Sequence, residues 1–339
     1  MFEVQKPTNS LILVTGGTGA VGPRVVQALH AAGYRVRILA LEAPGYGLLP
    51  EGIELHLGDV TDSGKVKSAM EGSDAVIHLA ALLHIMNPPP QLKKRYEEIN
   101  VGGTAKVAET AFRLGVKRVI LFSTIAVYGE SAGRVITEDS APHPDTFYAQ
   151  TKLKAERIVL DAKRSDGKSL GTVLRLAAVY GSRIKGNYQR LLKALARGRF
   201  IPIGPAHNRR TLIYDRDVGR AAVLAVEHPA AEGKIYNVSD GEFHTLGRII
   251  AAMCESLDRN PPHLSLPIEP VRFLAGILED LAGMAGLNSP ICRATVDKYT
   301  EDVAVSGERI QRELGFVPQY NLSAGWRETI QEMRCAGAL

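Results

Sequence analysis

Short apolar segments alternate, along the first third of the chain, with segments in which apolar residues recur at helical spacing. The apolar segments predict five buried strands, at Leu11–Val14, Tyr34–Leu41, Gly52–Leu57, Ala75–Leu79 and Arg118–Phe122. Strands that alternate with helices form parallel β-α-β units. We therefore expect an α/β fold built on a doubly wound parallel sheet.

Helical periodicity and breaker residues predict the segments between these strands. One helix starts at Pro23, a second ends at Met70, and a third spans Tyr96–Leu114. Three prolines predict a loop over His84–Gln91. A later apolar stretch, Val271–Leu287, contains three charged residues and is too short to span a membrane, so we expect an amphipathic surface or lid helix there.

The turn between the first strand and the first helix reads TGGTGAVG and begins at Thr15. Gly16 allows a tight turn, Gly19 lets backbone N–H groups approach a pyrophosphate, and Gly22 allows the helix to pack closely on the strand. A strand, a glycine-rich turn and a helix form the context of a dinucleotide-binding loop. We expect nucleotide binding here, and an ordinary glycine turn is the alternative.

The end of the second strand bears on which dinucleotide binds. A carboxylate at this place usually bonds the adenosine ribose, but the position is Ala40, and Glu42 follows two residues later. No arginine follows the strand to neutralise a 2′-phosphate. This charge pattern favours NAD, and NADP stays open.

A second cluster of polar residues follows the fifth strand. Tyr148 and Lys152 stand four residues apart, so a helix places them on one face. An ammonium beside a phenol favours the phenolate, which predicts a lowered pKa for Tyr148 and proton exchange with a substrate hydroxyl. The Thr124 hydroxyl, at the strand end, is expected to hold the substrate oxygen. The alternative for such a pair is a solvated helix face.

Composition limits the class of protein. The chain has 339 residues, 45% hydrophobic and 23% charged, with a net charge of +5 and no basic run, which argues against nucleic acid binding. Cys254, Cys292 and Cys335 lie far apart, so neither a disulfide framework nor a metal site is expected. The N-terminus lacks an apolar signal core, and we expect a cytoplasmic protein.

Several motifs together resemble one family. The first four are TGGTGAVG, the HLAA segment at His78–Ala81, STIAVYG from Ser123 and YAQTK from Tyr148. The later ones are NVGGT from Asn100, LRLAAVYG from Leu174, RRTLIYDRDV from Arg209, IYNVSDG from Ile235 and RELGFVPQYNLSAGW from Arg312. In number and order these motifs resemble the extended short-chain dehydrogenase/reductases, the NAD-dependent epimerase/dehydratase family.

The resemblance implies the roles of individual residues. Thr124, Tyr148 and Lys152 take the places of the catalytic hydroxyl, the acid/base and its partner, and Lys152 also bonds the nicotinamide ribose. The residues implied to bind the cofactor are Gly16, Gly19, Ala20, Val21, Gly22, Asp59, Val60, Leu79, Ala80, Ala81, Tyr148 and Lys152. Asn100 aligns with an asparagine near the active site, and capping of a helix is its alternative role.

The later half is expected to build the substrate site. Residues implied to contact the substrate are His84, Thr124, Asn187 and Arg210, the last two beside a nucleotide diphosphate. A guanidinium holds phosphate oxygens bidentately, which suits Arg210, whereas Arg209 is expected to be a solvated neighbour. Ala178 stands where UDP-galactose 4-epimerases carry an asparagine, which argues against identity with that enzyme.

The resemblance implies a Rossmann-like NAD(P)-binding domain over residues 1–175, to which 211–227 returns, and a smaller, mainly substrate-binding domain over 176–339. The expected function is NAD(P)-dependent redox chemistry on a nucleotide-activated sugar, with UDP-sugar 4-epimerisation favoured. A nucleotide-sugar 4-reductase, a 3β-hydroxysteroid-type dehydrogenase and a non-catalytic NAD(P) sensor are the alternatives. A homodimer is implied, pairing the helices around Lys106–Leu114 and Leu153–Val159.

Overall fold

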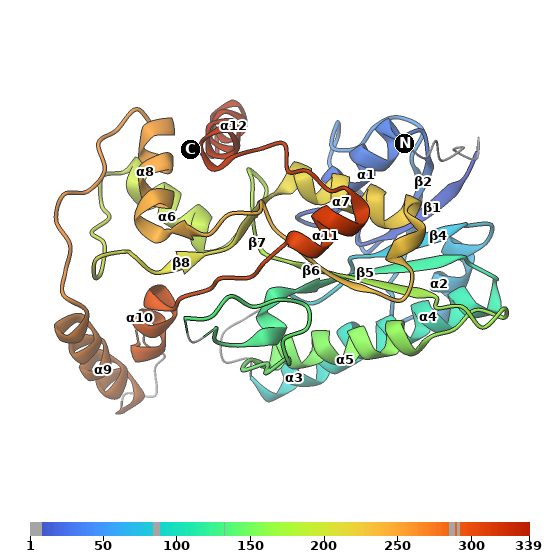
Figure 1. The fold of residues 1–339 in the computed structure, drawn as a ribbon, viewed down its shortest axis with the longest axis horizontal. Coiled ribbons are helices and arrows are strands. Elements are labelled where there is room, and N and C mark those ends of the chain that lie inside the picture. The colour runs from blue at the N-terminus through green and yellow to red at the C-terminus, as the bar shows by residue number, and fades with distance from the viewer. Residues whose placement is uncertain (1–8, 84–88, 132, 285–288, 290–291) are drawn as a thin grey trace.

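The computed structural model describes residues 9–83, 89–131, 133–284, 289 and 292–339. Its centre is a seven-stranded sheet in the order β10-β6-β5-β4-β1-β2-β3, and every neighbouring pair is parallel (Figure 1). The strands are β1 Leu11–Thr15, β2 Arg35–Ala40, β3 Glu54–Leu57, β4 Ala75–His78, β5 Arg118–Thr124, β6 Gly171–Leu176 and β10 Ile235–Val238. The predicted α/β fold is confirmed, and the five predicted strands start and end within two residues of the observed ones.

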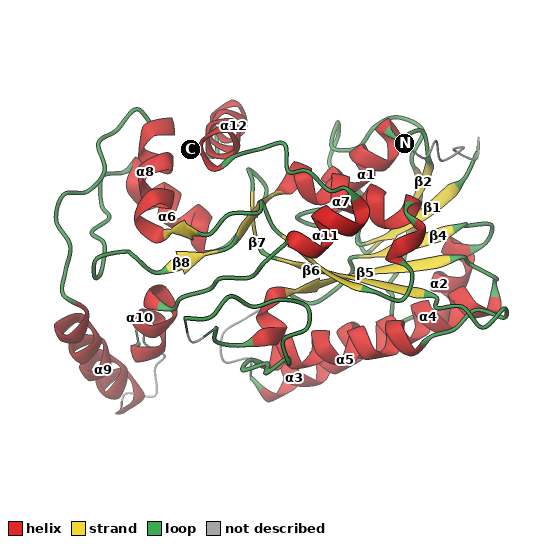
Figure 2. Cartoon of the chain, in the orientation of Figure 1, coloured by secondary structure: helices red, strands yellow, loops and turns green. Residues whose placement is uncertain are grey.

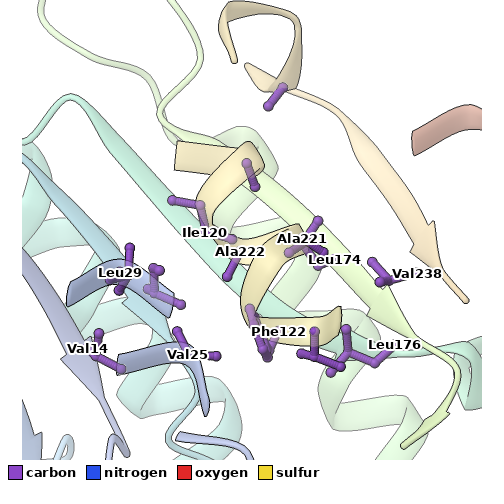
Figure 3. Close-up of a cluster of buried hydrophobic side chains, with 14 of the residues drawn as sticks. Val14, Val25, Leu29, Ile120, Phe122, Leu174, Leu176, Ala221, Ala222 and Val238 are labelled. Carbon is purple, nitrogen blue, oxygen red and sulfur yellow. The ribbon is translucent and has the colours of Figure 1, made fainter. Parts of the chain in front are cut away.

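Helices cover both faces of the sheet (Figure 2). The helices on one face are α1 Gly22–Ala31, α7 Asp215–Glu227 and α11 Glu308–Leu314, and those on the other are α2 Ser63–Met70, α4 Thr104–Arg113 and α5 Phe147–Asp161. Between the sheet and the first set of helices, one core joins Val14 of β1 and Phe122 of β5 with residues of two helices. These are Val25 and Leu29 of α1 and Ala222 of α7 (Figure 3). Residues 211–227 thus reach the sheet core chiefly through α7, which packs on α1.

The segment predicted as one long helix is divided into three parts. α3 spans Pro90–Tyr96, a π-helical stretch η1 spans Glu97–Gly103, and α4 follows directly. The predicted loop over His84–Gln91 is therefore too long at its end, because a proline fits the first turn of a helix, where its missing N–H has no partner to lose. Residues 84–88 lie outside the described part.

The C-terminal half adds a second core. Its helices are α6 Asn187–Ala196, α8 Leu246–Ser256, α9 Ile268–Met284, α10 Arg293–Thr300 and α12 Leu322–Cys335. Two small sheets pair β7 Ala178–Tyr180 with β9 Leu212–Tyr214, and β8 Arg209–Arg210 with β11 His244–Thr245. Trp326 stacks on Tyr180 at 4.5 Å between ring centroids inside this core. Two 3₁₀ turns, η2 Ile125–Tyr128 and η3 Pro229–Ala231, complete the elements.

Two findings concern membrane spans and metal sites, which the sequence analysis also considered. Among the described residues, no helix is long and apolar enough to cross a lipid bilayer. In the same part of the chain, no three His, Cys, Asp or Glu side chains gather in a way that suits a metal ion. The predicted helix near Val271–Leu287 is present as α9, which begins three residues earlier and lies at one end of the molecule (Figure 1).

Candidate active site

The strand order brings three of the predicted site segments to one edge of the sheet. β1 pairs with β2 on one side and with β4 on the other, and β5 follows β4. Because these strands are parallel, their carboxyl ends meet at the same edge, and the reversal between β1 and β4 is where doubly wound sheets bind ligands. The glycine turn follows β1, and the segment Leu79–Ala81 follows β4. Thr124 is the last residue of β5.

The glycine turn leaves no room for side chains on its inner side. Gly16 has a φ of +72° and its N–H donates to the Leu39 carbonyl at 2.8 Å. A Cβ on Gly16 would lie 2.9 Å from the backbone nitrogen of Ala80, and a Cβ on Gly22 would overlap the Gly17 carbonyl. The turn is thus pressed against the end of β4, as the prediction of close packing at these glycines requires.

The start of α1 is open to an anion. Val21 precedes the helix without a side-chain cap, and the first turn holds no acidic residue. The first N–H groups of a helix carry partial positive charge and lack intrahelical partners. Gly19 is exposed beside them, and Ala20 and Val21 are partly buried. The chain's residues therefore fit the pyrophosphate of a dinucleotide at this turn.

The other residues implied to bind the cofactor lie at neighbouring strand ends. Asp59 follows β3 and its carboxylate accepts the Thr61 N–H at 2.8 Å, which fixes the side chain in a turn. Val60 is buried against Gly103, where a Cβ would come within 2.9 Å of the valine methyl. Leu79, Ala80 and Ala81 are partly buried and follow β4.

Tyr148 and Lys152 lie in the first two turns of α5, which packs against β5 and η2. Thr146 caps the helix, since its hydroxyl accepts the Ala149 N–H at 3.2 Å. Lys152 is buried, with 3% of its surface exposed, and Tyr148 is partly buried. Thr124 ends β5, and its hydroxyl accepts the Ala126 N–H at 3.2 Å. The pair is not on a solvated helix face.

The expected lowering of the Tyr148 pKa is wrong for this structure. Burial raises the pKa of Tyr148 to about 12, and the neighbouring Tyr96 ring, 6.4 Å away between centroids, acts in the same direction. Burial also lowers the pKa of Lys152 to about 8, although the Glu156 carboxylate opposes that shift. Removal from water disfavours both the phenolate and the ammonium, and it is the largest cause of both shifts.

A run of buried hydrogen bonds joins the turn after β1 to the following helices. The two ring nitrogens of His78 lie 2.7 Å from the Thr15 hydroxyl and 3.0 Å from the Thr104 hydroxyl. The Thr104 hydroxyl donates to the Asn100 carbonyl at 2.6 Å. Burial, together with the Lys152 charge, lowers the pKa of His78 to about 3, so the ring is neutral at physiological pH.

The run continues through Asn100 to helix α5. Its amide oxygen accepts the Leu82 N–H at 2.8 Å, and its amide nitrogen donates to the Leu82 carbonyl and to the Thr151 hydroxyl. The Thr151 hydroxyl in turn donates to the Tyr148 carbonyl at 2.8 Å. The alternative role of Asn100 as a helix cap is wrong, because it lies inside the π-helical stretch, a form often found at functional sites.

These two threonines were not singled out by the sequence analysis. Thr104 and Thr151 are buried, and both of their hydroxyls hydrogen-bond to Asn100. A signal was available, since Thr104 ends the NVGGT motif and Thr151 belongs to YAQTK. The Glu156 carboxylate, which is also buried, accepts a hydrogen bond from the Ser123 hydroxyl and forms an ion pair with Arg175 at 2.6 Å.

The two neighbouring arginines of β8 behave differently from the prediction. Arg209 is not a solvated neighbour, because it forms a bidentate ion pair with Asp302, with contacts of 2.6 and 3.2 Å. The Arg210 guanidinium, 13% exposed, donates to the carbonyls of Lys298 and Tyr299 at the end of α10. Part of its hydrogen-bonding capacity is therefore already used.

The residues implied to contact the substrate are brought together only in part. Asn187 is exposed at the start of α6, and His84 lies outside the described residues. Burial raises the pKa of Tyr188 to about 12 and the charge of Arg210 opposes that shift, so Arg210 lies within electrostatic range of Tyr188 at the start of α6. A cavity of about 220 Å³ lies between β7, α6 and α12, with Ala178 and Asn187 in its wall.

Comparison with known proteins agrees with this geometry. The sequence profile of the "NAD dependent epimerase/dehydratase family" matches residues 12–239. An N-acetyl-alpha-D-glucosaminyl-diphospho-ditrans,octacis-undecaprenol 4-epimerase of Escherichia coli O157:H7 is 28% identical, with 95% of each chain covered. A UDP-glucose 4-epimerase of Vibrio cholerae is also 28% identical, with 94% of each chain covered.

A solved structure supports the fold. The UDP-glucose 4-epimerase of Thermotoga maritima, determined with UDP-glucose, superposes with a TM-score of 0.77 at 23% identity, over 96% of this chain and 99% of the other. The predicted enzyme class agrees with the family match, and the family's description names the predicted cofactor. The chain belongs to the NAD-dependent epimerase/dehydratase family.

Proposed function

We propose that this enzyme is a nucleotide-sugar 4-epimerase that uses NAD, with a UDP-sugar as its substrate. The observation that carries the proposal is the placement of Tyr148 and Lys152 on α5, which packs against the strand that ends at Thr124. That strand end belongs to the sheet edge where the glycine turn fits a dinucleotide. The relatives from Escherichia coli and Vibrio cholerae are both named 4-epimerases.

The residues of the chain supply positioning and proton transfer. Bound NAD would supply a reversible acceptor for the hydride of the sugar's C4–H bond. Tyr148 accepts the proton of the C4 hydroxyl as the 4-keto sugar forms, and returns it when the hydroxyl is regenerated. Thr124 donates a hydrogen bond to the same oxygen. Lys152, buried one turn further along α5 on the same helix face, would bond the nicotinamide ribose.

The pyrophosphate of NAD is assigned to the glycine turn, at Gly16, Gly19, Ala20, Val21 and Gly22. The adenine is assigned to Asp59 and Val60, and the middle of the cofactor to Leu79, Ala80 and Ala81. NAD is preferred to NADP, because the residues after β2, Leu41 and Glu42, are exposed and neither is basic, so neither would neutralise a 2′-phosphate. His84, Asn187 and Arg210 are assigned to the substrate.

The test is a panel of UDP-, GDP- and dTDP-sugars incubated with the purified enzyme and followed by NMR of the C4 proton. Interconversion of the two C4 epimers without net change of free NAD(H) supports the proposal, and Tyr148→Phe serves as the inactive control. Stoichiometric NAD(P)H turnover would instead indicate a reductase or a hydroxysteroid-type dehydrogenase. Cofactor binding without turnover of any sugar would favour the sensor.

We also infer that the protein is a cytoplasmic homodimer. Within each subunit, we infer that the first domain ends near residue 175. The dimer would pair α4 with α5, where Phe112 is exposed on α4. The packing of α7 on α1 supports the return of residues 211–227 to the first domain. The pairing of β10 with β6 supports the inclusion of residues 235–238 in that domain as well. Size-exclusion chromatography with light scattering distinguishes the dimer from the monomer.

A further inference from the structure

Helix α9 (Ile268–Met284) uses its polar side chains against its packing partner, α10. Arg272 pairs with Asp297 at 2.7 Å, and Arg293 of α10 reaches back to Asp280 at 2.9 Å. Ala275 and Gly276 are buried on the same side, where the Arg293 guanidinium lies over Gly276. The charged side chains Arg272, Glu279 and Asp280 thus lie on the side of α9 that packs on α10.

The other side of α9 exposes a continuous apolar stripe. Its members are large side chains with the exposed fractions Phe273 70%, Leu274 58%, Ile277 40%, Leu278 52%, Leu281 56% and Met284 84%. Most of these positions are related by steps of four residues, which places them on one face of a helix. Scattered apolar residues on a surface are common, but a contiguous patch of this kind marks an interaction site.

The stripe continues onto the chain that precedes α9. Leu264 is 77% exposed, Leu266 44% and Ile201 52%. Leu266 pairs with the neighbouring segment, since its N–H donates to the Pro202 carbonyl at 2.8 Å and its carbonyl accepts the Gly204 N–H at 2.7 Å. These three apolar side chains therefore lie beside the start of α9, at the end of the molecule where Figure 1 shows that helix.

Exposed cations lie near the Ile201 end of this surface. Arg197 and Arg199 precede Ile201, and Arg259 lies close to them, because a Cβ on Gly198 would be 3.4 Å from its guanidinium. Within the described part of the chain, none of these three arginines forms an ion pair. An apolar stripe beside unpaired arginines is complementary to acyl chains beside anionic headgroups.

We propose that the apolar stripe of α9, together with Ile201, Leu264 and Leu266, docks on an anionic phospholipid bilayer. The helix lies in the plane of the interface, and Arg197, Arg199 and Arg259 face the headgroups. A second copy of the chain fits this surface less well, since it would bring the same unpaired arginines to the interface. The proposal goes beyond the sugar chemistry and is independent of the sugar that is bound.

Co-sedimentation with vesicles tests the proposal on the full chain. We expect binding to vesicles of phosphatidylcholine mixed with phosphatidylglycerol, and much weaker binding to phosphatidylcholine alone. Leu274→Gln with Leu278→Gln should lower the partition coefficient on the order of 100-fold, because two leucines are withheld from the acyl region. Arg197→Glu with Arg199→Glu should weaken only the binding that depends on anionic lipid and low salt.

The matched control is Val135→Gln with Val317→Gln, since both valines are exposed apolar residues outside the α9 surface. Circular dichroism and the thermal midpoint verify that each variant is folded. The proposal is overturned if the native chain sediments with neither vesicle, or if the control loses as much binding as the α9 variant. It is also overturned if light scattering shows an oligomer that the α9 variant dissociates, since the stripe would then contact a second copy.

Discussion

The cofactor edge of the sheet and the C-terminal half are held together by different kinds of contact. At the cofactor edge, parallel strands, glycine contacts and neutral hydrogen bonds such as His78 to Thr15 fix the backbone. In the C-terminal half, ion pairs and side-chain bonds to carbonyls join distant segments, for example Arg209 to Asp302 and Asn208 to the Tyr299 and Glu301 carbonyls.

This difference has consequences for what each region is able to do. Backbone contacts are short in range and leave little freedom, which suits a site that must hold a cofactor and a proton donor in fixed relation. Exposed charge pairs contribute little net stability and are weakened by salt. The C-terminal half is therefore better able to adjust around a substrate, and the mutations below test this contrast.

The largest effect is expected at the proton donor. Tyr148→Phe removes one hydroxyl and little volume, so turnover should fall by about 10²–10⁴-fold while NAD affinity and the thermal midpoint stay near native values. Steady-state kcat and calorimetric NAD titration measure both. The control is Tyr236→Phe, which removes hydrogen bonds to Ala230 and Glu313 far from the site and should lower stability without lowering kcat. Near-native turnover in Tyr148→Phe would remove the assigned role.

His78 should make the cofactor edge sensitive to acid. Its pKa is about 3 in the folded chain and about 6.5 when unfolded, so the unfolded state takes up the proton first. Titration of His78 does not change the free energy of unfolding above pH 6.5. Below pH 6.5 it lowers that free energy by about 1.4 kcal/mol per pH unit, to a loss of about 5 kcal/mol near pH 3. Urea unfolding of the native chain and of His78→Gln across this range measures the slope. An equal slope in both would contradict the assignment.

The cofactor edge was largely predictable because its signals are local in sequence. Glycine spacing, apolar strands and the Tyr148–Lys152 spacing lie within short stretches, and the parallel direction of the strands follows from their alternation with helices. Burial is not local, however, and it reversed the expected pKa shift of Tyr148. The π-helical turn at Asn100 was also missed, since its residues carry an ordinary helical pattern.

The C-terminal half was less predictable because its contacts span about ninety residues of sequence. Nothing near Arg209 in the sequence identifies Asp302 as its partner, or the end of α10 as the place where Arg210 donates. The return of β10 to the main sheet was missed for the same reason, as its pairing with β6 links residues 173 and 235. A local pattern contains no information on such pairings.

Lys152 should show opposite effects on stability and on function. Its pKa of about 8 in the folded chain, against about 10.4 unfolded, means that holding the buried ammonium at pH 7 costs about 3 kcal/mol. Lys152→Met should therefore raise the free energy of unfolding by an amount on that order, while turnover and NAD affinity fall. In the native chain, the Lys152 contribution to stability should rise between pH 8 and 10.4, because the folded state releases its proton first.

The control for this prediction is Lys154→Met, on the exposed side of the same helix. Lys154 pairs with Glu97 at 2.6 Å, and both side chains are substantially exposed. Such a pair contributes less than about 1 kcal/mol, so this variant should change stability little and leave turnover intact. A Lys152→Met protein that is less stable than the native chain at pH 7 would show that the ammonium is well solvated or paired.

The smallest expected effect, on substrate binding alone, compares the two neighbouring arginines. Arg210→Ala should weaken nucleotide-sugar binding by about 1.5–3 kcal/mol, the contribution of a charge-assisted hydrogen bond, and leave NAD affinity unchanged. Arg209→Ala breaks the pair with Asp302, in which both side chains are about one-third exposed, so it should lower the thermal midpoint slightly without changing either affinity. Calorimetric titration of the best sugar nucleotide and of NAD into both variants measures these values, and Arg210→Lys tests whether charge alone suffices.

Because the Arg210 guanidinium also donates to the carbonyls that end α10, a purely structural role predicts a lower midpoint with native sugar affinity. That result would move the diphosphate away from β8 and toward the start of α6.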